Sequence, residues 1–197
     1  MSHPRGLIEA VDPHEFKDLA ARYGDGALER VDLDIDEALY RLRTEKATDR
    51  RAEVVFAIRG PGGGVLVHRK AFWEDGLYRL PSGGINRGEP VIDALVRELR
   101  EETTLAAEEI RFLGAQDCHL HYEGRTCRFV SYVFHLPRVS GRLVPEEKEE
   151  IAEFRELTRD GLAALAVRLR HLEPPYTGWG RWRAAAHELV YRRLTGR

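Results

Sequence analysis

The 197-residue sequence has very little cysteine, with only Cys118 and Cys127 present. Two cysteines are too few for the disulfide framework of a small secreted domain, and they indicate a reducing compartment such as the cytoplasm. The first residues, MSHPRGLIEAVDPHEF, also lack the basic and then apolar pattern of a secretory signal. No run of 18 apolar residues occurs, which excludes a transmembrane helix. The sequence therefore predicts a cytoplasmic protein without a membrane partner.

Neither sign of charge dominates the chain. The 31 Lys and Arg residues face 33 Asp and Glu residues, which gives a net charge of −2. Such a balance supplies no large basic field, so binding to nucleic acid is not expected. Apolar residues make up 43% and charged residues 32%, as is typical of a globular protein. The length is enough for one domain and a modest extension.

The character of the chain changes near residue 51. Residues 1–50 are charged, and they predict two helices, one that begins at Pro13 and one over residues 34–46. No chemistry stands out in this segment. We interpret residues 1–50 as a helical extension that packs on the domain or forms a homodimer, with a cover over the substrate as the alternative. Residues 51–197 are predicted to form the main domain.

The main domain alternates strand and helix signals irregularly. Strands are expected at residues 53–59, 65–69, 77–80, 110–120, 125–136 and 153–157, and helices near residues 90–103, 159–170 and 180–194. This irregular order predicts an α/β fold in which helices cover both faces of a mixed β-sheet.

The most informative segment is LPSGGINRGEPVIDALVRELREETTL, residues 80–105. Its second half predicts a helix with four apolar residues at helical spacing as its buried stripe: Ile92, Leu95, Val96 and Leu99. At 100° per residue, Glu98, Glu101 and Glu102 fall on one face roughly 100° wide, and two of them border the buried stripe.

Three carboxylates on one helix face are unfavourable without a partner. Exposed like charges at this spacing repel by about 0.2–0.5 kcal/mol per pair, and the helix dipole disfavours anions in the C-terminal half. A divalent cation would compensate, and carboxylate oxygens suit Mg²⁺ or Mn²⁺ rather than zinc. The alternative is a solvated helix with ion pairs such as Arg97–Glu101. The preceding loop, with Gly83 and Gly84, favours a site, because its backbone can direct carbonyls at a metal and N–H groups at phosphate oxygens.

The segment resembles the Nudix box, Gly-x5-Glu-x7-Arg-Glu-(aliphatic)-x-Glu-Glu-x-Gly-(aliphatic). Eight of its nine defined positions match: Gly83, Glu89, Arg97, Glu98, Leu99, Glu101, Glu102 and Leu105. The resemblance implies a Nudix-type α/β/α sandwich with a mixed β-sheet over residues 51–197, closed by a C-terminal helix. Thr104 stands where the box has its last glycine. Because a β-branched residue resists positive φ, we expect the helix to end differently or to run slightly longer.

The resemblance also implies a reaction. Nudix hydrolases use Mg²⁺ to cleave the diphosphate linkage of a nucleoside diphosphate derivative by water attack at phosphorus. By this resemblance Glu98 and Glu102 bind the metal, Glu101 completes the cluster, and the backbone carbonyl of Ser82 is a further ligand. A non-catalytic Nudix-like module that binds a nucleotide for regulation is the alternative.

The remaining expectations concern neighbours of the metal. By resemblance, Glu89 orients the cluster through hydrogen bonds, Arg97 holds a glutamate in place, and Glu98 is one candidate for the group that accepts the proton. The acidic loop PEEKEE offers Glu149 or Glu150 as an additional metal ligand, with a solvated loop as an equal alternative.

Substrate contacts are less clearly marked. Gly83 and Gly84 are expected to bind phosphate oxygens, and Tyr122 matches a tyrosine position associated with dinucleoside polyphosphates. Trp179 and Trp182 are expected to anchor the last helix. The sequence predicts a small nucleotide as the substrate but does not identify it.

Overall fold

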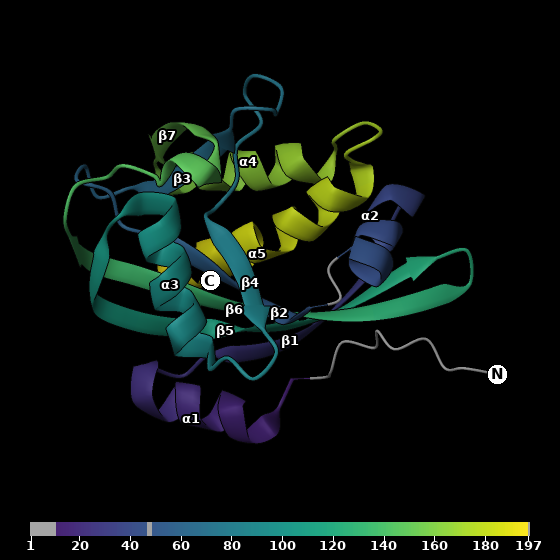
Figure 1. Cartoon of the computed structure of the whole chain (residues 1–197), viewed down its shortest axis with the longest axis horizontal. Helices are drawn as coiled ribbons and strands as arrows, with labels where there is room; N and C mark the ends of the chain where they lie inside the picture. Colours follow the sequence, from purple (N-terminus) through teal and green to yellow (C-terminus); the bar gives the residue numbers. More distant parts are fainter. Residues whose placement is uncertain (1–10, 47–48, 197) are drawn as a thin grey trace.

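The computed structural model describes residues 11–46 and 49–196 (Figure 1). The helices are α1 (Pro13–Tyr23), α2 (Glu37–Arg41) with the π-helical turn η1 (Leu42–Lys46), α3 (Val91–Thr103), the 3-10 turn η2 (Glu147–Glu149), α4 (Arg159–Arg170) and α5 (Thr177–Thr195). The strands are β1 (Ala27–Asp34), β2 (Arg50–Ile58), β3 (Val65–Lys70), β4 (Ser82–Asn86), β5 (Ala106–Tyr122), β6 (Arg125–Ser140) and β7 (Ile151–Leu157). None of the helices described is long and apolar enough to cross a membrane.

A five-stranded mixed sheet forms the centre of the molecule, in the order β1-β5-β6-β2-β4. The pairs β1–β5 and β2–β6 are parallel, while β5–β6 and β2–β4 are antiparallel. β5 and β6 are joined by a two-residue turn in which Glu123 and Gly124 both have positive φ, as such a hairpin requires. The predicted mixed sheet is confirmed.

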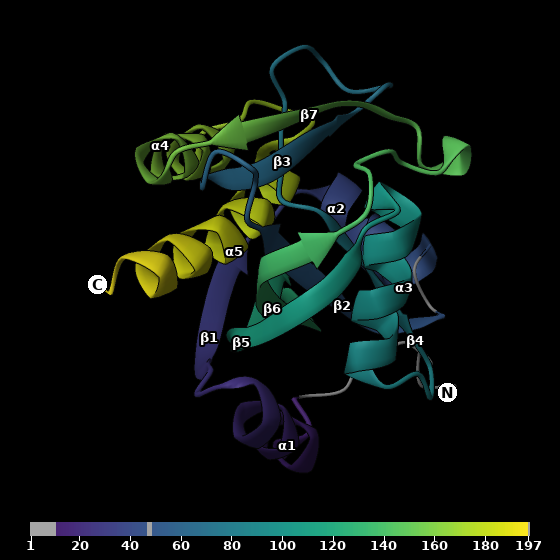
Figure 2. The ribbon, with the colours of Figure 1, turned by 90° about the vertical axis from the view of Figure 1, so that its left-hand side faces the viewer.

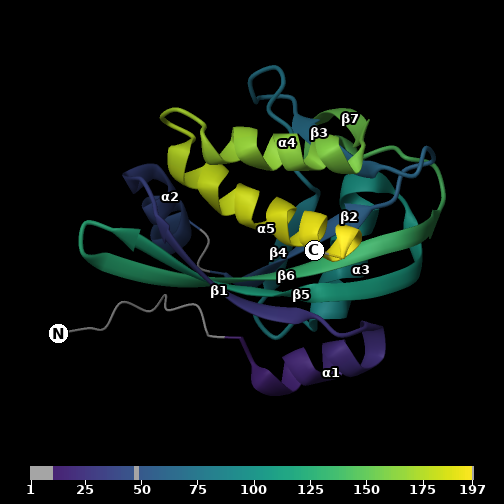
Figure 3. The same ribbon diagram turned by 180° about the vertical axis from the view of Figure 1, so that it is seen from behind.

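Both faces of this sheet are buried, and strand β2 shows why. Val54 and Phe56 point into a core cluster with α1 and α3, whereas Val55 and Ala57 point into a second cluster with α4 and α5. Figure 2 shows α5, β3 and β7 above the sheet and α1 below it. Seen from behind, α5 runs across the sheet beneath α4 (Figure 3). The three layers follow from a central strand whose residues are apolar on both sides.

The N-terminal segment differs from the prediction. Helix α1 begins at Pro13, as expected, and Gly24 is its C-cap residue. Residues 27–34, however, form strand β1, which pairs in parallel with β5 and extends the central sheet. The second predicted helix is shorter and begins at Glu37. The predicted helical character of residues 1–10 and 47–48 lies outside the described residues.

Two further expectations need correction. The strand predicted at residues 77–80 is only a single bridge between His68 and Arg79, and β4 begins later, at Ser82. In α3, Val96 is 49% exposed, and Val91 and Ala94 take part in the buried stripe instead. Compared with the prediction, the buried stripe of α3 is therefore rotated toward the face that carries Glu98, Glu101 and Glu102.

Helix α3 ends at Thr104 in the left-handed conformation (φ 56°, ψ 12°). The expectation that threonine would change the end of the helix is therefore wrong, because the chain adopts the conformation that a glycine would have. Two hydrogen bonds hold it there. Its backbone N–H donates to the carbonyl of Arg100 at 2.8 Å, and its hydroxyl donates to the carbonyl of Arg142 at 2.7 Å.

Candidate active site

Strand β4 and helix α3 bring the glycine loop against the acidic face of the helix. A Cβ atom added to Gly83 would lie 1.8 Å from Cδ of Glu98, so the carboxyl group occupies the space of the missing side chain. Glu98 is 8% exposed and Glu102 1% exposed. Burial raises the pKa of the Glu98 carboxyl. Gly83 is thus required for the observed position of the Glu98 carboxylate as well as for the conformation of the loop.

Arg97 joins the loop to the helix. Its Nε and Nη2 donate to the carboxylate of Glu89 at 2.8 and 3.0 Å, and Nη2 also donates to the carbonyl of Gly84 at 2.8 Å. Its Nη1 donates to Glu98 at 2.6 Å. Glu89 in turn accepts from the backbone N–H of Asn86 at 2.8 Å, and the hydrogen bonds from Arg97 lower the pKa of this carboxyl. The structure thus brings Glu89, Arg97 and Glu98 together, and their roles at a metal site stay predictions.

Glu102 lies deepest. One carboxylate oxygen accepts from the backbone N–H of Ser82 at 3.1 Å. The other lies 3.5 Å from Nη2 of Arg79, 3.6 Å from Nζ of Lys70 and 4.0 Å from Nε2 of His68. Desolvation outweighs the charges of Arg79 and Lys70 and raises the pKa of Glu102 to about 7. A carboxyl group of this pKa carries a charge that its surroundings do not fully stabilise.

The third acid of the helix and the later acidic loop are partly exposed. Glu101 lies 3.2 Å from Nζ of Lys148 and 3.9 Å from Nη1 of Arg97. In the loop it is Glu149 that approaches the site, since Lys70 donates to its carboxylate at 3.1 Å and to its carbonyl at 2.6 Å. Glu150 is exposed. The ammonium of Lys70 therefore lies between the carboxylates of Glu102 and Glu149.

Ser82 has arginines on its other side. Its hydroxyl accepts hydrogen bonds from Nη1 of Arg79 and from Nη1 of Arg183, the latter at 3.2 Å. Arg183 also donates to Glu53 at 2.9 Å. Sequence reasoning did not find Arg79, Arg183 or Glu53, since they come from separate segments and belong to no local motif.

Gly84 and Tyr122 were also predicted to bind the substrate. A Cβ on Gly84 would lie 2.2 Å from Cδ of Arg50, so a cationic side chain passes directly over this glycine. Tyr122, at the end of the β5–β6 hairpin, packs 5.4 Å from the ring of Tyr40 and under the guanidinium of Arg125. Its part in substrate binding stays a prediction.

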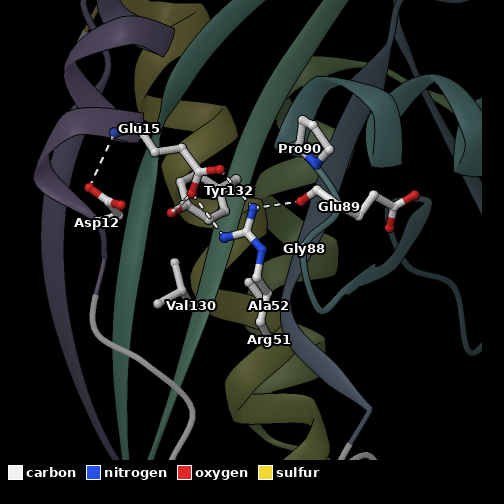
Figure 4. A pocket seen from close by; sticks show the side chains of 9 residues that line it. All are labelled: Asp12, Glu15, Arg51, Ala52, Gly88, Glu89, Pro90, Val130 and Tyr132. Atoms are coloured by element: carbon white, nitrogen blue, oxygen red, sulfur yellow. Dashed lines mark hydrogen bonds and ion pairs between the residues drawn. The ribbon is translucent and has the colours of Figure 1, made fainter.

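A pocket of about 450 Å³ opens behind the glycine loop, between α1 and the start of α3 (Figure 4). Arg51 points across it. Its guanidinium donates to both carboxylate oxygens of Glu15, at 2.9 and 2.7 Å, and to the carbonyl of Glu89 at 2.8 Å. The hydroxyl of Tyr132 donates to Glu15 at 2.8 Å. The backbone of a box residue is thereby tied to the N-terminal helix.

Known proteins match this chain over the same region. The NUDIX domain family model matches residues 49–176, more than half of the chain. The chain therefore belongs to the Nudix family, as the box residues indicated.

The curated relatives are matched only in part. An NAD-capped RNA hydrolase, NudC, of Pseudomonas aeruginosa is 30% identical over 114 residues, which cover 56% of this chain and 38% of that protein. An RNA pyrophosphohydrolase of Xanthomonas campestris is 39% identical over 70 residues, 32% of this chain and 34% of that protein. The chain thus spans little more than a third of the length of these relatives.

Solved structures show the same fold. The MutT NUDIX hydrolase of Burkholderia pseudomallei aligns with a TM-score of 0.50 and 24% identity, over 72% of this chain and 97% of that one. A structure described as an ADP compounds hydrolase aligns with a TM-score of 0.52 and 18% identity, over 74% and 73% of the two chains. The predicted Nudix-type sandwich is confirmed.

Proposed function

We propose that this protein is a pyrophosphohydrolase that uses a divalent metal ion to cleave the diphosphate linkage of a nucleoside diphosphate derivative, by attack of water at phosphorus. The observation that carries the proposal is the position of Glu98 and Glu102. Both carboxylates are buried on one face of α3, and both have a raised pKa. They lie beside Gly83 and the backbone N–H of Ser82.

The residues around this face fit a hard cation. In residues 11–46 and 49–196 no three His, Cys, Asp or Glu side chains are already arranged as a metal site. The donor set nevertheless consists of carboxylate and carbonyl oxygens, which suit Mg²⁺ or Mn²⁺. A cation would also relieve the poorly stabilised charge of the buried carboxylates. The groups proposed to hold it are Glu98, Glu101, Glu102, the carbonyl of Ser82, and Glu149 or Glu150. The contact of Glu149 with Lys70 favours Glu149 over Glu150.

Polar residues and glycines in the box segment have further proposed parts. A bound metal ion would neutralise phosphate oxygens and acidify a water molecule. Arg97 orients Glu98 through its 2.6 Å hydrogen bond, and Glu89 fixes Arg97 through two more. Glu98 accepts the proton of the attacking water. The N–H groups of Gly83 and Gly84 bind phosphate oxygens.

A substrate panel tests the proposal. The protein is incubated with Mg²⁺ or Mn²⁺ and with nucleoside triphosphates, ADP-ribose, NADH, coenzyme A, dinucleoside polyphosphates and nucleotide sugars. Because two relatives are named for RNA substrates, a short RNA with a 5′-triphosphate is included. Turnover of at least one compound that stops with EDTA is expected. If compounds bind but none is turned over, the enzyme proposal is refuted and a non-catalytic nucleotide-binding module is favoured.

A matched pair of variants tests the metal ligands. Glu102→Gln keeps the shape of the side chain and removes its charge, so the rate should fall by a factor of about 10² or more. Glu108→Gln removes an exposed carboxylate after the helix and should leave the rate unchanged. A normal rate in the first variant would refute the metal assignment.

The proposal includes the setting of the enzyme. We infer a small nucleotide as substrate and a cytoplasmic location, which two buried free cysteines support. Residues 51–197 are proposed as the Nudix domain, and residues 1–50 as an N-terminal extension that contributes strand β1 to its sheet and could form a homodimer.

A further inference from the structure

Several buried arginine nitrogens lack a hydrogen-bond partner, and two of the arginines contact Ser82. Among the described residues, seven buried side-chain polar atoms lack such a partner, and four of them are guanidinium nitrogens: Nε and Nη2 of Arg43, Nε of Arg79 and Nε of Arg183. Buried N–H groups almost always have an acceptor, and arginine offers only donors. The missing partners are therefore acceptors.

The three arginines lie next to one another. Arg79 and Arg183 share the hydroxyl of Ser82. Arg183 and Arg43 share the ring of Trp182, with guanidinium carbons 3.9 and 5.4 Å from its centroid, and Arg43 also lies 3.4 Å from the centroid of Phe129. The aromatic rings pack against the guanidinium groups, but they are poor hydrogen-bond acceptors.

The carboxylates nearby do not balance these cations. Glu53 is paired with Arg183 at 2.9 Å, and Glu102 lies 3.5 Å from Arg79. Arg43 is 6% exposed and has no carboxylate within ion-pair distance among the residues described. Burial lowers its pKa to about 10. A buried cation without a partner is costly, so this group favours an anion from outside the chain.

The segments that carry these side chains flank the family-matched region. Arg43 precedes residue 49 and Arg183 follows residue 176. The two segments are joined, since the backbone N–H of Gly178 donates to Asp36 at 2.6 Å. The side chain of Arg183 is 12% exposed and that of Arg79 is 7% exposed, so we place the entry of a ligand at Arg183. Ser82 links the cluster to Glu102, because its hydroxyl accepts from Arg79 and Arg183 and its backbone N–H donates to Glu102.

We propose that Arg43 and Arg183 form an anion subsite that binds a phosphate group of the substrate beyond the diphosphate held at the carboxylates. This inference rests on the proposed function. It assigns the substrate to nucleotides with at least three phosphate groups in a row, rather than to ADP-ribose or NADH. Guanidinium groups suit this task because they bind phosphate oxygens with two parallel hydrogen bonds.

Tryptophan fluorescence in EDTA tests the subsite without turnover. The chain has three tryptophans, and each has one of these arginines within 6 Å of its ring: Arg79 at Trp73, Arg183 at Trp179, and Arg43 and Arg183 at Trp182. Titration with ATP should therefore change the emission. Arg43→Met and Arg183→Lys should each weaken ATP binding about tenfold, and should change ADP-ribose binding less than twofold.

Controls separate this subsite from general effects. Arg192→Gln alters another arginine of α5, which pairs with Glu29, and should bind ATP normally. The double variant Glu53→Gln/Arg183→Met removes the arginine without leaving Glu53 unpaired, and circular dichroism checks its fold. Unchanged ATP affinity in folded variants, equal losses for ADP-ribose, or no ATP binding by the unaltered protein would overturn the subsite. If ATP binding depends on the arginines but no compound is hydrolysed, only the enzyme proposal is overturned.

Discussion

The guanidinium of Arg51 donates two hydrogen bonds to the carboxylate of Glu15, at 2.9 and 2.7 Å. The pair connects helix α1 to strand β2, and both side chains are 22% exposed. Arg51 extends the connection to the carbonyl of Glu89. The N-terminal helix is therefore part of the support of the Nudix box.

Arg51→Met should lower the free energy of unfolding by about 1.5–3 kcal/mol, because a partly buried charged pair with good geometry is lost. Urea denaturation measures the change. As a control, Glu37→Gln removes the carboxylate from an exposed pair with Arg41 and should cost no more than about 0.5 kcal/mol. Equal effects of the two substitutions would show that the α1 connection contributes no more than a surface pair.

Gly83→Ala should lower the rate of hydrolysis while the protein stays folded. The new methyl group would occupy the position of the Glu98 carboxyl, 1.8 Å from its Cδ, and the side chain must turn away. Rates and Mn²⁺ affinity, the latter measured by electron paramagnetic resonance, should both fall by a factor of about 10 or more. Gly161→Ala, at the start of α4, meets its nearest atom at 3.3 Å and should retain both properties. Full activity of the Gly83 variant would mean that Glu98 is not required in its observed position.

Thr104 provides a test of backbone conformation. Thr104→Gly removes the strain of a side chain at φ 56°, whereas Thr104→Val keeps a β-branched side chain there and loses the hydrogen bond to Arg142. The glycine variant should be more stable than the valine variant by about 1–2 kcal/mol. Thermal or chemical denaturation compares them. A valine variant at least as stable as the glycine variant would contradict the assigned conformation.

His187 should make stability depend on pH. Its Nδ1 lies 2.8 Å from the carbonyl of Arg183, and its Nε2 accepts from the backbone N–H of Leu80 at 3.0 Å, so the neutral ring is bound on both sides. Burial lowers its pKa to about 3, below the ordinary value near 6.5. The unfolded chain thus takes up a proton that the folded chain does not. The stability due to this group is complete above pH 6.5 and is lost as the pH falls toward 3.

The slope should reach about 1.4 kcal/mol per pH unit for this one group. Urea denaturation from pH 7 to pH 4 measures it in the unaltered protein and in His187→Gln, whose amide does not titrate. The variant should be less stable at pH 7 but should show a smaller decline. Parallel curves for the two proteins would exclude His187 as a source of the pH dependence.

The acidic face of α3 was predictable because its signal is local. The acids Glu98, Glu101 and Glu102 are at most four residues apart in the sequence. Arg97 reaches back along the first turns of α3 to Glu89, just before the helix. The contacts of Glu102 with Lys70 and Arg79 follow from packing between distant segments. No periodicity in the sequence encodes such contacts.

Strand β1 was missed for a physical reason. An edge strand is recognised by alternation of apolar and polar residues, but Leu28 is 57% exposed and the inward-facing Glu29 is charged. Glu29 is tolerated because Arg192 of α5 pairs with it at 2.6 Å. The pattern becomes intelligible only when the last helix is known.

The family match ends at residue 176, and α5 begins one residue later. This helix buries apolar residues such as Trp182, Leu189 and Val190, and it covers one face of the central sheet (Figure 3). A shortened protein that ends at the family boundary would expose Leu113 and Val133 of the sheet to water. Exposed apolar patches of this kind cause aggregation. We therefore expect that the chain cannot be cut at the limit of family similarity and still fold.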